Sequence, residues 1–213
     1  MTIAVLDNFT DSDSTGLNSH TPDTDTVGSG WIDATALSGN GTIQGNQLQL
    51  GVDNRGHVID SGQSDCDIDV DWILSAGNDR NSVIFRWQDT SNYWLCNFRE
   101  PNSDIQIVEN ITVRASSSYT WSGSSYAINV NLNGTGIDCS VDGVSQVTYT
   151  SSSYQTETHH GIFRNSGANG TRLDNFQIAT LGGGTGTTVL RLAGDGGLAG
   201  TGGLAGRSGG LAG

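Results

Sequence analysis

Apolar and polar residues alternate with a period of two along much of the chain, and this pattern predicts β-strands. The alternation is strict over residues 66–72, where Cys66, Ile68, Val70 and Trp72 are separated by Asp67, Asp69 and Asp71. Successive strand residues point to opposite faces of a sheet, so this segment predicts one apolar and one acidic face. Further strands are predicted at 82–87, 93–99, 105–108, 111–113, 126–132, 137–141, 144–150 and 172–178. No segment has the spacing of an amphipathic helix, which favours an all-β fold.

Turn-forming residues separate several of these strands and predict hairpins. Asp142-Gly143 matches the two central residues of a type I′ turn, which both need positive φ. Asn133-Gly134 ends the preceding strand, and Glu109-Asn110 lies between two short apolar runs. The segments 6–9 and 173–176 both read Leu-Asp-Asn-Phe, and we interpret them as first and last strands that pair with each other.

The hydrophobic content of 34% is low, but a sandwich of two sheets needs only alternate residues in its core. About 180 residues are enough for one such domain. We therefore expect an antiparallel jelly-roll β-sandwich over residues 1–180, followed by an extended glycine-rich tail over residues 181–213.

Several motifs resemble those of the concanavalin A-like and laminin-G-like jelly rolls found in bacterial and phage proteins. They are Asp7-Asn8-Phe9, the loop at 16–23 with Trp31 after it, and the segments 83–94, 141–143, 161–164 and 173–176. The resemblance spans roughly residues 5 to 180 and implies the fold. It implies little about function, because this fold includes lectins, glucanases and structural modules.

The tail repeats Leu-Ala-Gly, with glycine at every third position over much of its length. The repeated positions are Leu192, Leu198, Leu204 and Leu211, with Gly194, Gly197, Gly200 and Gly203 among the glycines. Such spacing suits a threefold extended helix whose glycines pack at its axis. A strand docked on a partner and a flexible linker are the alternatives. Leucines that recur in one setting favour burial, so we expect the tail to assemble or anchor the protein, with a homotrimer as the expected form.

The formal charge of −13 and the complete lack of lysine argue against nucleic-acid binding. The first residues contain neither a basic region nor a long apolar stretch, so we expect no signal peptide and no membrane insertion. A jelly roll with a Leu-Ala-Gly-rich tail and no secretion signal resembles tailed-phage virion proteins. The resemblance implies a virion location after synthesis in the host cytoplasm.

Acidic residues suggest a calcium site, although no cofactor is expected to be required. If the first and last strands pair, Asp7 and Asp174 lie close enough to share a calcium ion, as jelly rolls of this superfamily often do near strand ends. Turn capping by these side chains is the alternative.

The three cysteines, Cys66, Cys96 and Cys139, are odd in number and widely spaced. We interpret them as small buried apolar residues rather than as a disulfide framework or a zinc site.

Four aromatic residues in Ser-rich, loop-like surroundings are candidates for glycan binding: Trp31, Tyr119, Trp121 and Tyr154. An exposed ring stacks on a sugar face while nearby amides bind its hydroxyl groups. The alternative is that these rings cap the ends of the sandwich.

The acidic strand face raises the question of glycoside hydrolysis, because glucanases of this superfamily place their acid pair on an alternating strand. Here every candidate is Asp, and the Glu-x-Asp-x-x-Glu pattern is absent. We expect a solvated face paired with arginines such as Arg86, and no enzyme activity.

Together these observations favour a phage virion decoration or fibre protein with an outward-facing, lectin-like jelly roll. Its partners are expected to be its own subunits, other virion proteins and host surface polysaccharide. A bacterial extracellular carbohydrate-binding module is the alternative, and a glycan hydrolase is a third.

Overall fold

The computed structural model describes residues 1–35, 41–74, 79–166 and 171–181. The chain divides into two units, Met1–Gly183 and Gly184–Gly213. The positions predicted to form the assembly tail, Leu192 to Leu211, lie outside the described residues.

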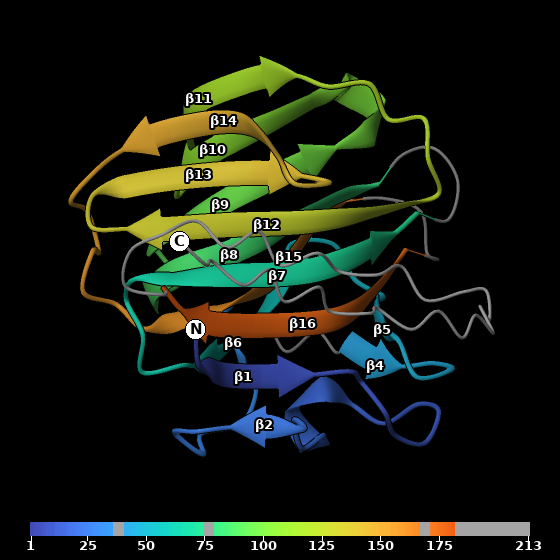
Figure 1. Ribbon diagram of the computed structural model, residues 1–213. Helices are drawn as coiled ribbons and strands as arrows, with labels where there is room; N and C mark the ends of the chain where they lie inside the picture. Colours follow the sequence, from blue (N-terminus) through green and yellow to red (C-terminus); the bar gives the residue numbers. More distant parts are fainter. Residues whose placement is uncertain (36–40, 75–78, 167–170, 182–213) are drawn as a thin grey trace, which may run out of the picture. The chain divides into compact units, whose positions relative to one another are not determined.

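The first unit is a sandwich of two antiparallel sheets, as the alternating pattern predicted (Figure 1). Sheet A has nine strands: β1 (Ile3–Asp7), β2 (Thr24–Asp25), β4 (Gly41–Ile43), β5 (Leu48–Leu50), β7 (Cys66–Ile73), β12 (Ser125–Asn133), β13 (Gly136–Val141), β14 (Val144–Thr150) and β16 (Arg172–Thr180). Sheet B has seven strands: β3 (Ile32–Asp33), β6 (Arg55–Asp60), β8 (Arg80–Asp89), β9 (Asn92–Arg99), β10 (Asp104–Glu109), β11 (Thr112–Ser118) and β15 (His159–Ser166). Two short 3₁₀ helices, Leu17–Ser19 and Glu100–Asn102, lie in connections.

The first and last strands pair, which confirms the interpretation of the two Leu-Asp-Asn-Phe segments. In sheet A, β16 lies between β7 and β1. Asp7 faces Phe176 across the β1–β16 pair, and the amide of Thr180 donates to the carbonyl of Thr2 (2.9 Å). The two ends of the domain therefore lie side by side in Figure 1.

The predicted hairpins also form. At the β13–β14 turn Asp142 and Gly143 have φ values of 50° and 77°, as a type I′ turn requires. The hairpin of β10 and β11 turns at Asn110, which also has positive φ (55°). Each hairpin fixes the register of its two strands, so the apolar positions of both fall on the same face of the sheet.

The core between the sheets is built from the alternate apolar residues of both. On β7 the inward set is the one the pattern predicted: Cys66, Ile68, Val70 and Trp72 are all buried. On the facing sheet, Trp94, Cys96 and Phe98 of β9 are buried in the same cluster. This burial of apolar area is the main stabilising contribution to the fold.

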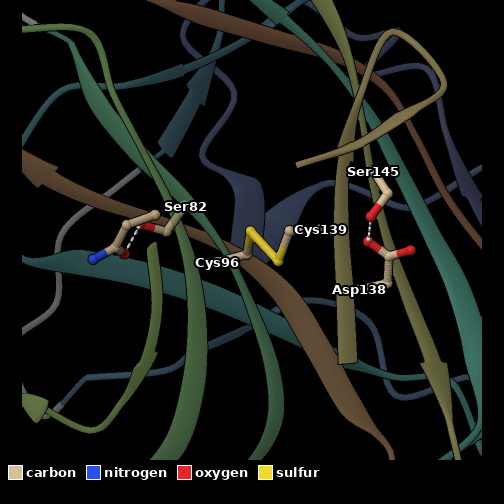
Figure 2. The surroundings of a disulfide bond; sticks show 6 residues. Ser82, Cys96, Asp138, Cys139 and Ser145 are labelled. Carbon is tan, nitrogen blue, oxygen red and sulfur yellow. Dashed lines mark hydrogen bonds between the residues drawn. A yellow bond between two sulfur atoms is a disulfide. The ribbon is translucent and has the colours of Figure 1, made fainter. Parts of the chain in front are cut away.

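A disulfide joins Cys96 of β9 to Cys139 of β13 and so links the two sheets (Figure 2). The interpretation of all three cysteines as unpaired was therefore wrong for two of them. The partners are 43 residues apart in sequence, and only the stacking of the sheets brings their Cα atoms within 6.5 Å. Cys66 is free and buried, as expected.

Candidate binding pocket

The outer face of sheet B carries a second apolar cluster that is separate from the core. It consists of Ala34, Val58, Ile84, Leu95, Val108 and Phe163, with Trp87 and Tyr93 packed against it. These residues alternate along their strands with core residues, so β9 presents Trp94 and Cys96 inward but Tyr93 and Leu95 outward. All six residues are buried, so they form a small second core on this side of sheet B.

A pocket of about 270 Å³ opens on this face. We call it the amide pocket, because five of the residues that line it carry side-chain amides. The lining residues are Asn54, Tyr93, Leu95, Asn97, Gln106, Val108, Asn110, Ile111, Val113, Phe163 and Asn165.

A hydrogen-bond network orients two of these amides. The Ser82 hydroxyl donates to Oδ1 of Asn97 (2.5 Å). Nδ2 of Asn165 donates to the Ser82 oxygen (2.7 Å) and to Oδ1 of Asn97 (3.1 Å). Ser82 and Asn97 are almost fully buried, so the network fixes the rotamers of both amides.

Apolar groups form the rest of the lining. The rings of Tyr93 and Phe163 stack at a centroid distance of 6.5 Å and an interplanar angle of 24°. Ile111, at the β10–β11 turn, is 86% exposed, and Val113 is 51% exposed. Rings and methyl groups beside oriented amides are the combination that small-molecule sites commonly use.

Charged side chains on the neighbouring strands are paired with one another. Nε of Arg99 donates to Oδ1 of Asp104 (2.7 Å), and Nε of Arg114 donates to Oε2 of Glu109 (2.8 Å). Nε2 of Gln106 donates to Oδ2 of Asp104 (3.2 Å). The Oε1 atom of Gln106 can therefore act as an acceptor. None of the described residues that line the amide pocket is ionisable except Tyr93, and burial raises the pKa of that phenol.

The acidic face of β7 lies on the opposite sheet, where its carboxylates accept hydrogen bonds from asparagine side chains. Nδ2 of Asn131 donates to Asp67 (2.7 Å), and Nδ2 of Asn129 donates to Asp69 (2.9 Å). Asp71 accepts from Asn175 (2.7 Å). The expected pairing with arginine is present at the neighbouring Asp65, which accepts from Nη2 of Arg86 (3.3 Å).

Asp7, a predicted calcium ligand, is fully buried and already hydrogen-bonded at both oxygens. Its Oδ1 accepts from the amide of Phe9 (2.7 Å) and from Nε2 of His20 (2.9 Å). Its Oδ2 accepts from Nε1 of Trp31 (2.7 Å). Burial raises the pKa of Asp7, although these hydrogen bonds act in the opposite direction. A calcium ion would have to displace these donors.

Asp174, the second predicted ligand, lies on β16 and accepts from the amide of Asn175 (2.8 Å). Burial raises its pKa, and the charges of Asp71 and Asp7 act in the same direction. In the described ranges there is no group of three or more His, Cys, Asp or Glu side chains suited to a metal ion.

The four predicted glycan-binding rings occupy different places, and none lines the amide pocket. Trp31 is 3% exposed and packs on Phe176 in the core, so it offers no exposed ring for stacking. Tyr119 and Trp121 are half-buried in one aromatic group with Trp72, with 4.5 Å between their ring centroids. The hydroxyl of Tyr154 donates to Oδ1 of Asn92 (3.0 Å). Trp31 belongs to the core, and Tyr119, Trp121 and Tyr154 pack against it.

The pocket residues were missed because they lie on strands. Tyr93, Asn97 and Phe163 belong to β9 and β15, where polar and apolar residues follow each other without the loop-like context used as a criterion. The available signal was Asn97, a polar residue in the outward register of a strand whose neighbouring outward positions, Tyr93 and Leu95, are bulky.

His159 and His160 point to opposite faces of β15, as adjacent strand residues must. His159 contacts the Trp87 ring, whereas His160 is fully buried. Nδ1 of His160 accepts from the amide of Arg86 (3.1 Å), and Nε2 donates to the carbonyl of Gln63 (2.7 Å). Burial lowers the pKa of His160 to about 4 and raises that of the nearby Cys66 thiol to about 12, so both are neutral near pH 7.

Across the described part of the chain, every helix is too short to cross a membrane.

No protein-family model matches the chain, and no curated protein matches it. Solved structures do match, at low sequence identity. The carbohydrate-binding module CBM66 from Bacillus subtilis is 16% identical with a TM-score of 0.50, over 70% of this chain and 92% of that one.

Two further matches extend over more of the chain. The exoplasmic domain of VIP36, in a Ca²⁺- and Man2-bound form, is 8% identical with a TM-score of 0.52, over 82% of this chain and 89% of that one. A structure from work on endo-acting O-glycanases of human gut bacteria is 11% identical with a TM-score of 0.55. This match covers 84% of this chain and 100% of that one. These similarities show the fold, a concanavalin A-like jelly roll, as the sequence motifs implied.

Proposed function

We propose that the jelly roll is a glycan-binding module whose ligand occupies the amide pocket. The observation that carries this proposal is the pocket itself, where oriented amides lie beside stacked rings and exposed aliphatic side chains. A sugar has hydroxyl groups that need hydrogen-bond partners and C–H faces that pack on apolar surface. The carbohydrate-bound and carbohydrate-binding proteins of similar fold support this reading.

Binding of the full chain to a glycan array, followed by calorimetry on any ligand found, tests the proposal. Tyr93→Ala removes the ring at the pocket wall and is expected to weaken binding by about tenfold or more. Val144→Ala is the matched control, because Val144 is 61% exposed at the β13–β14 turn of the other sheet. Absence of binding to every glycan by the folded protein would contradict the proposal.

A non-enzymatic role is part of the proposal. The carboxylates of Asp67 and Asp69 are hydrogen-bonded to asparagines on sheet A, whereas the amide pocket lies on sheet B. The double variant Asp67→Asn/Asp69→Asn is therefore expected to bind glycan like the parent chain. Glycan breakdown by the parent that this variant lacks would support the hydrolase alternative instead.

For the biological setting, we propose a virion decoration or fibre protein, in which a homotrimer displays the pocket outward. The repeated Leu-Ala-Gly motif of residues 192–213 favours this over a free-standing carbohydrate-binding module. Light scattering after gel filtration, on the full chain and on a chain that stops at Thr180, tests it. A trimer that becomes a monomer on truncation supports the tail as the assembly element, and a monomer in both cases contradicts it.

A further inference from the structure

A row of charged residues borders the amide pocket on the outer face of sheet B. Arg99 lies two residues beyond Asn97 on β9, so the two side chains are on the same face, about 7 Å apart along the strand. Arg80 of β8 is directly opposite Arg99, and Asp104 of β10 is directly opposite it on the other side. Directly opposite residues share a face, so all three side chains adjoin the amides that line the pocket.

The carboxylate of this row is engaged by Arg99. Nε of Arg99 donates to Oδ1 of Asp104 (2.7 Å), and Nη2 of Arg99 donates to Oδ2. Gln106 also donates to Oδ2 of Asp104 (3.2 Å). One carboxylate therefore accompanies two guanidinium groups, and like charges that face each other across two strands are destabilising. A second anion beside Arg80 would remove this cost.

Arg80 differs from the other arginines in residues 1–35, 41–74, 79–166 and 171–181. Each of the others donates a side-chain hydrogen bond to a carboxylate or a carbonyl oxygen: Arg55, Arg86, Arg99, Arg114, Arg164 and Arg172. Within the same ranges Arg80 has no hydrogen bond or ion pair of its side chain, although it is half-buried. A cation that is partly removed from water is stabilised by a bound anion.

The acidic residues closest to Arg80 along the chain and across the strand pair have other partners. Asp79, the preceding residue, is buried, and adjacent strand residues point to opposite faces. Oε2 of Glu100 accepts from the backbone amide of Asp79 (3.3 Å). The guanidinium group of Arg80 therefore offers its donors to a ligand.

A planar guanidinium group binds a carboxylate or a sulfate through two parallel hydrogen bonds. The pocket itself supplies amides, rings and aliphatic groups, and its described lining residues include no cation. A ligand that uses both would place hydroxyl groups in the pocket and an oxyanion beside Arg80. An acidic sugar has this layout, because its carboxylate or sulfate is attached to the ring that carries the hydroxyl groups.

The net charge of −13 makes this local contact decisive. A strongly acidic protein repels an anion at long range, so an acidic sugar gains affinity only from a cation that it touches. Without Arg80, an acidic sugar should bind no more tightly than its uncharged counterpart.

We propose that the glycan in the amide pocket is acidic and that Arg80 binds its carboxylate or sulfate group. This inference rests on the proposed glycan-binding function and adds the substrate class.

Calorimetry on the full chain with matched sugars tests the inference. The acidic probes are methyl glucuronide, methyl galacturonide and the 6-sulfates of methyl glucoside and methyl galactoside, and the uncharged probes are methyl glucoside and methyl galactoside. At least one acidic sugar is expected to bind about tenfold more tightly than its uncharged counterpart, because a charge-assisted pair of hydrogen bonds is added. A preference for the uronides identifies the bound group as a carboxylate, and a preference for the 6-sulfates identifies it as a sulfate ester.

Arg80→Gln removes the charge and is expected to abolish the preference, while affinity for the uncharged sugars stays the same. The variant should melt no lower than the parent, since it also removes the repulsion from Arg99. Arg172→Gln is the matched control: it makes the same change in net charge on β16 of sheet A and should keep the full preference. A clearly lower melting temperature of Arg80→Gln would show that Arg80 serves the fold, and would overturn the inference.

The failure of this inference differs from failure of the proposed function. Binding of uncharged glycans by the parent chain, with equal or lower affinity for the acidic ones, overturns the acidic ligand and leaves glycan binding intact. A preference that Arg80→Gln retains overturns the role of Arg80. Absence of binding to every array glycan and every probe, by a chain whose melting shows that it is folded, overturns both proposals.

Discussion

His160 shows how far one residue position can change the environment of a side chain. Its neighbour His159 lies against Trp87 on the outer face of sheet B, while His160 is enclosed between the sheets and bonded to two backbone groups. A protonated imidazole could not keep its acceptor role toward the amide of Arg86. Because His160 is buried in its neutral form, the stability of the folded domain depends on pH.

Acid should destabilise the domain through His160. An unfolded histidine titrates near pH 6.5, whereas burial lowers the pKa of His160 to about 4. Between these values the unfolded state takes up a proton that the folded state does not, so stability falls as the pH falls from 6.5 to 4. The shift corresponds to a loss on the order of 3 kcal/mol. Calorimetric melting over this range should show a smaller pH-dependent decrease for His160→Gln than for the parent, and equal decreases would contradict the assignment.

Calcium is expected to have no effect on stability through Asp7. Both carboxylate oxygens of this buried residue already accept hydrogen bonds, from Phe9, His20 and Trp31. A ligand that binds only the folded state raises the melting temperature, so the measurement is melting with excess calcium and with chelator. A calcium-dependent rise that Asp174→Asn abolishes would restore the predicted site.

Strands β6 and β15 show what limits the prediction of elements from sequence. Their alternation is hidden because both faces are covered: Val58 belongs to the outer cluster, and Ile59 belongs to the core. By contrast, β7 and β12 have one solvated face, and the predicted segments 66–72 and 126–132 lie within them. Period-two patterns are therefore readable only where one face meets water.

Close approach of β15 to β6 depends on Gly161. A Cβ atom at this position would lie 2.0 Å from the carbonyl oxygen of His57 and 2.9 Å from Cα of Val58. Gly161→Ala is expected to destabilise the domain by about 3 kcal/mol or more, because backbone must move. Gly16→Ala is the control, since nothing lies within 4 Å of its Cβ position and its φ is −71°. Similar denaturant midpoints for the two variants would show that the strands can separate at little cost.

At the scale of the whole molecule, the two sheets are joined by the core and by one covalent link. Sequence analysis identified the sandwich from alternation, hairpin turns and the paired ends, all of which are local or repeated signals. The disulfide and the amide pocket were not identified, because each depends on residues from several strands. Cys96 and Cys139 meet across the sheets, and Asn97 meets Asn165 only through the β9–β8–β15 order.

Reduction of the Cys96–Cys139 disulfide should lower stability without changing the fold. Closing a loop of this length restricts the unfolded chain by about 4 kcal/mol in the entropic model. Thiol titration in denaturant should find one free thiol per chain before reduction and three after. Urea unfolding with and without reductant measures the loss, and Cys66→Ala, at the free cysteine, should leave the reductant effect unchanged. Three thiols before reduction would contradict the link.

The pairing of β16 between β7 and β1 has a consequence for biosynthesis. While a ribosome is still extending the chain, β1 and β7 are available early, but the strand that joins them ends at Thr180. The edges of β7 and β1 that pair with β16 therefore stay unpaired until nearly the whole domain has been translated. Strands with open edges can pair with other chains, so the nascent domain needs protection by chaperones for longer than a fold built from neighbouring segments.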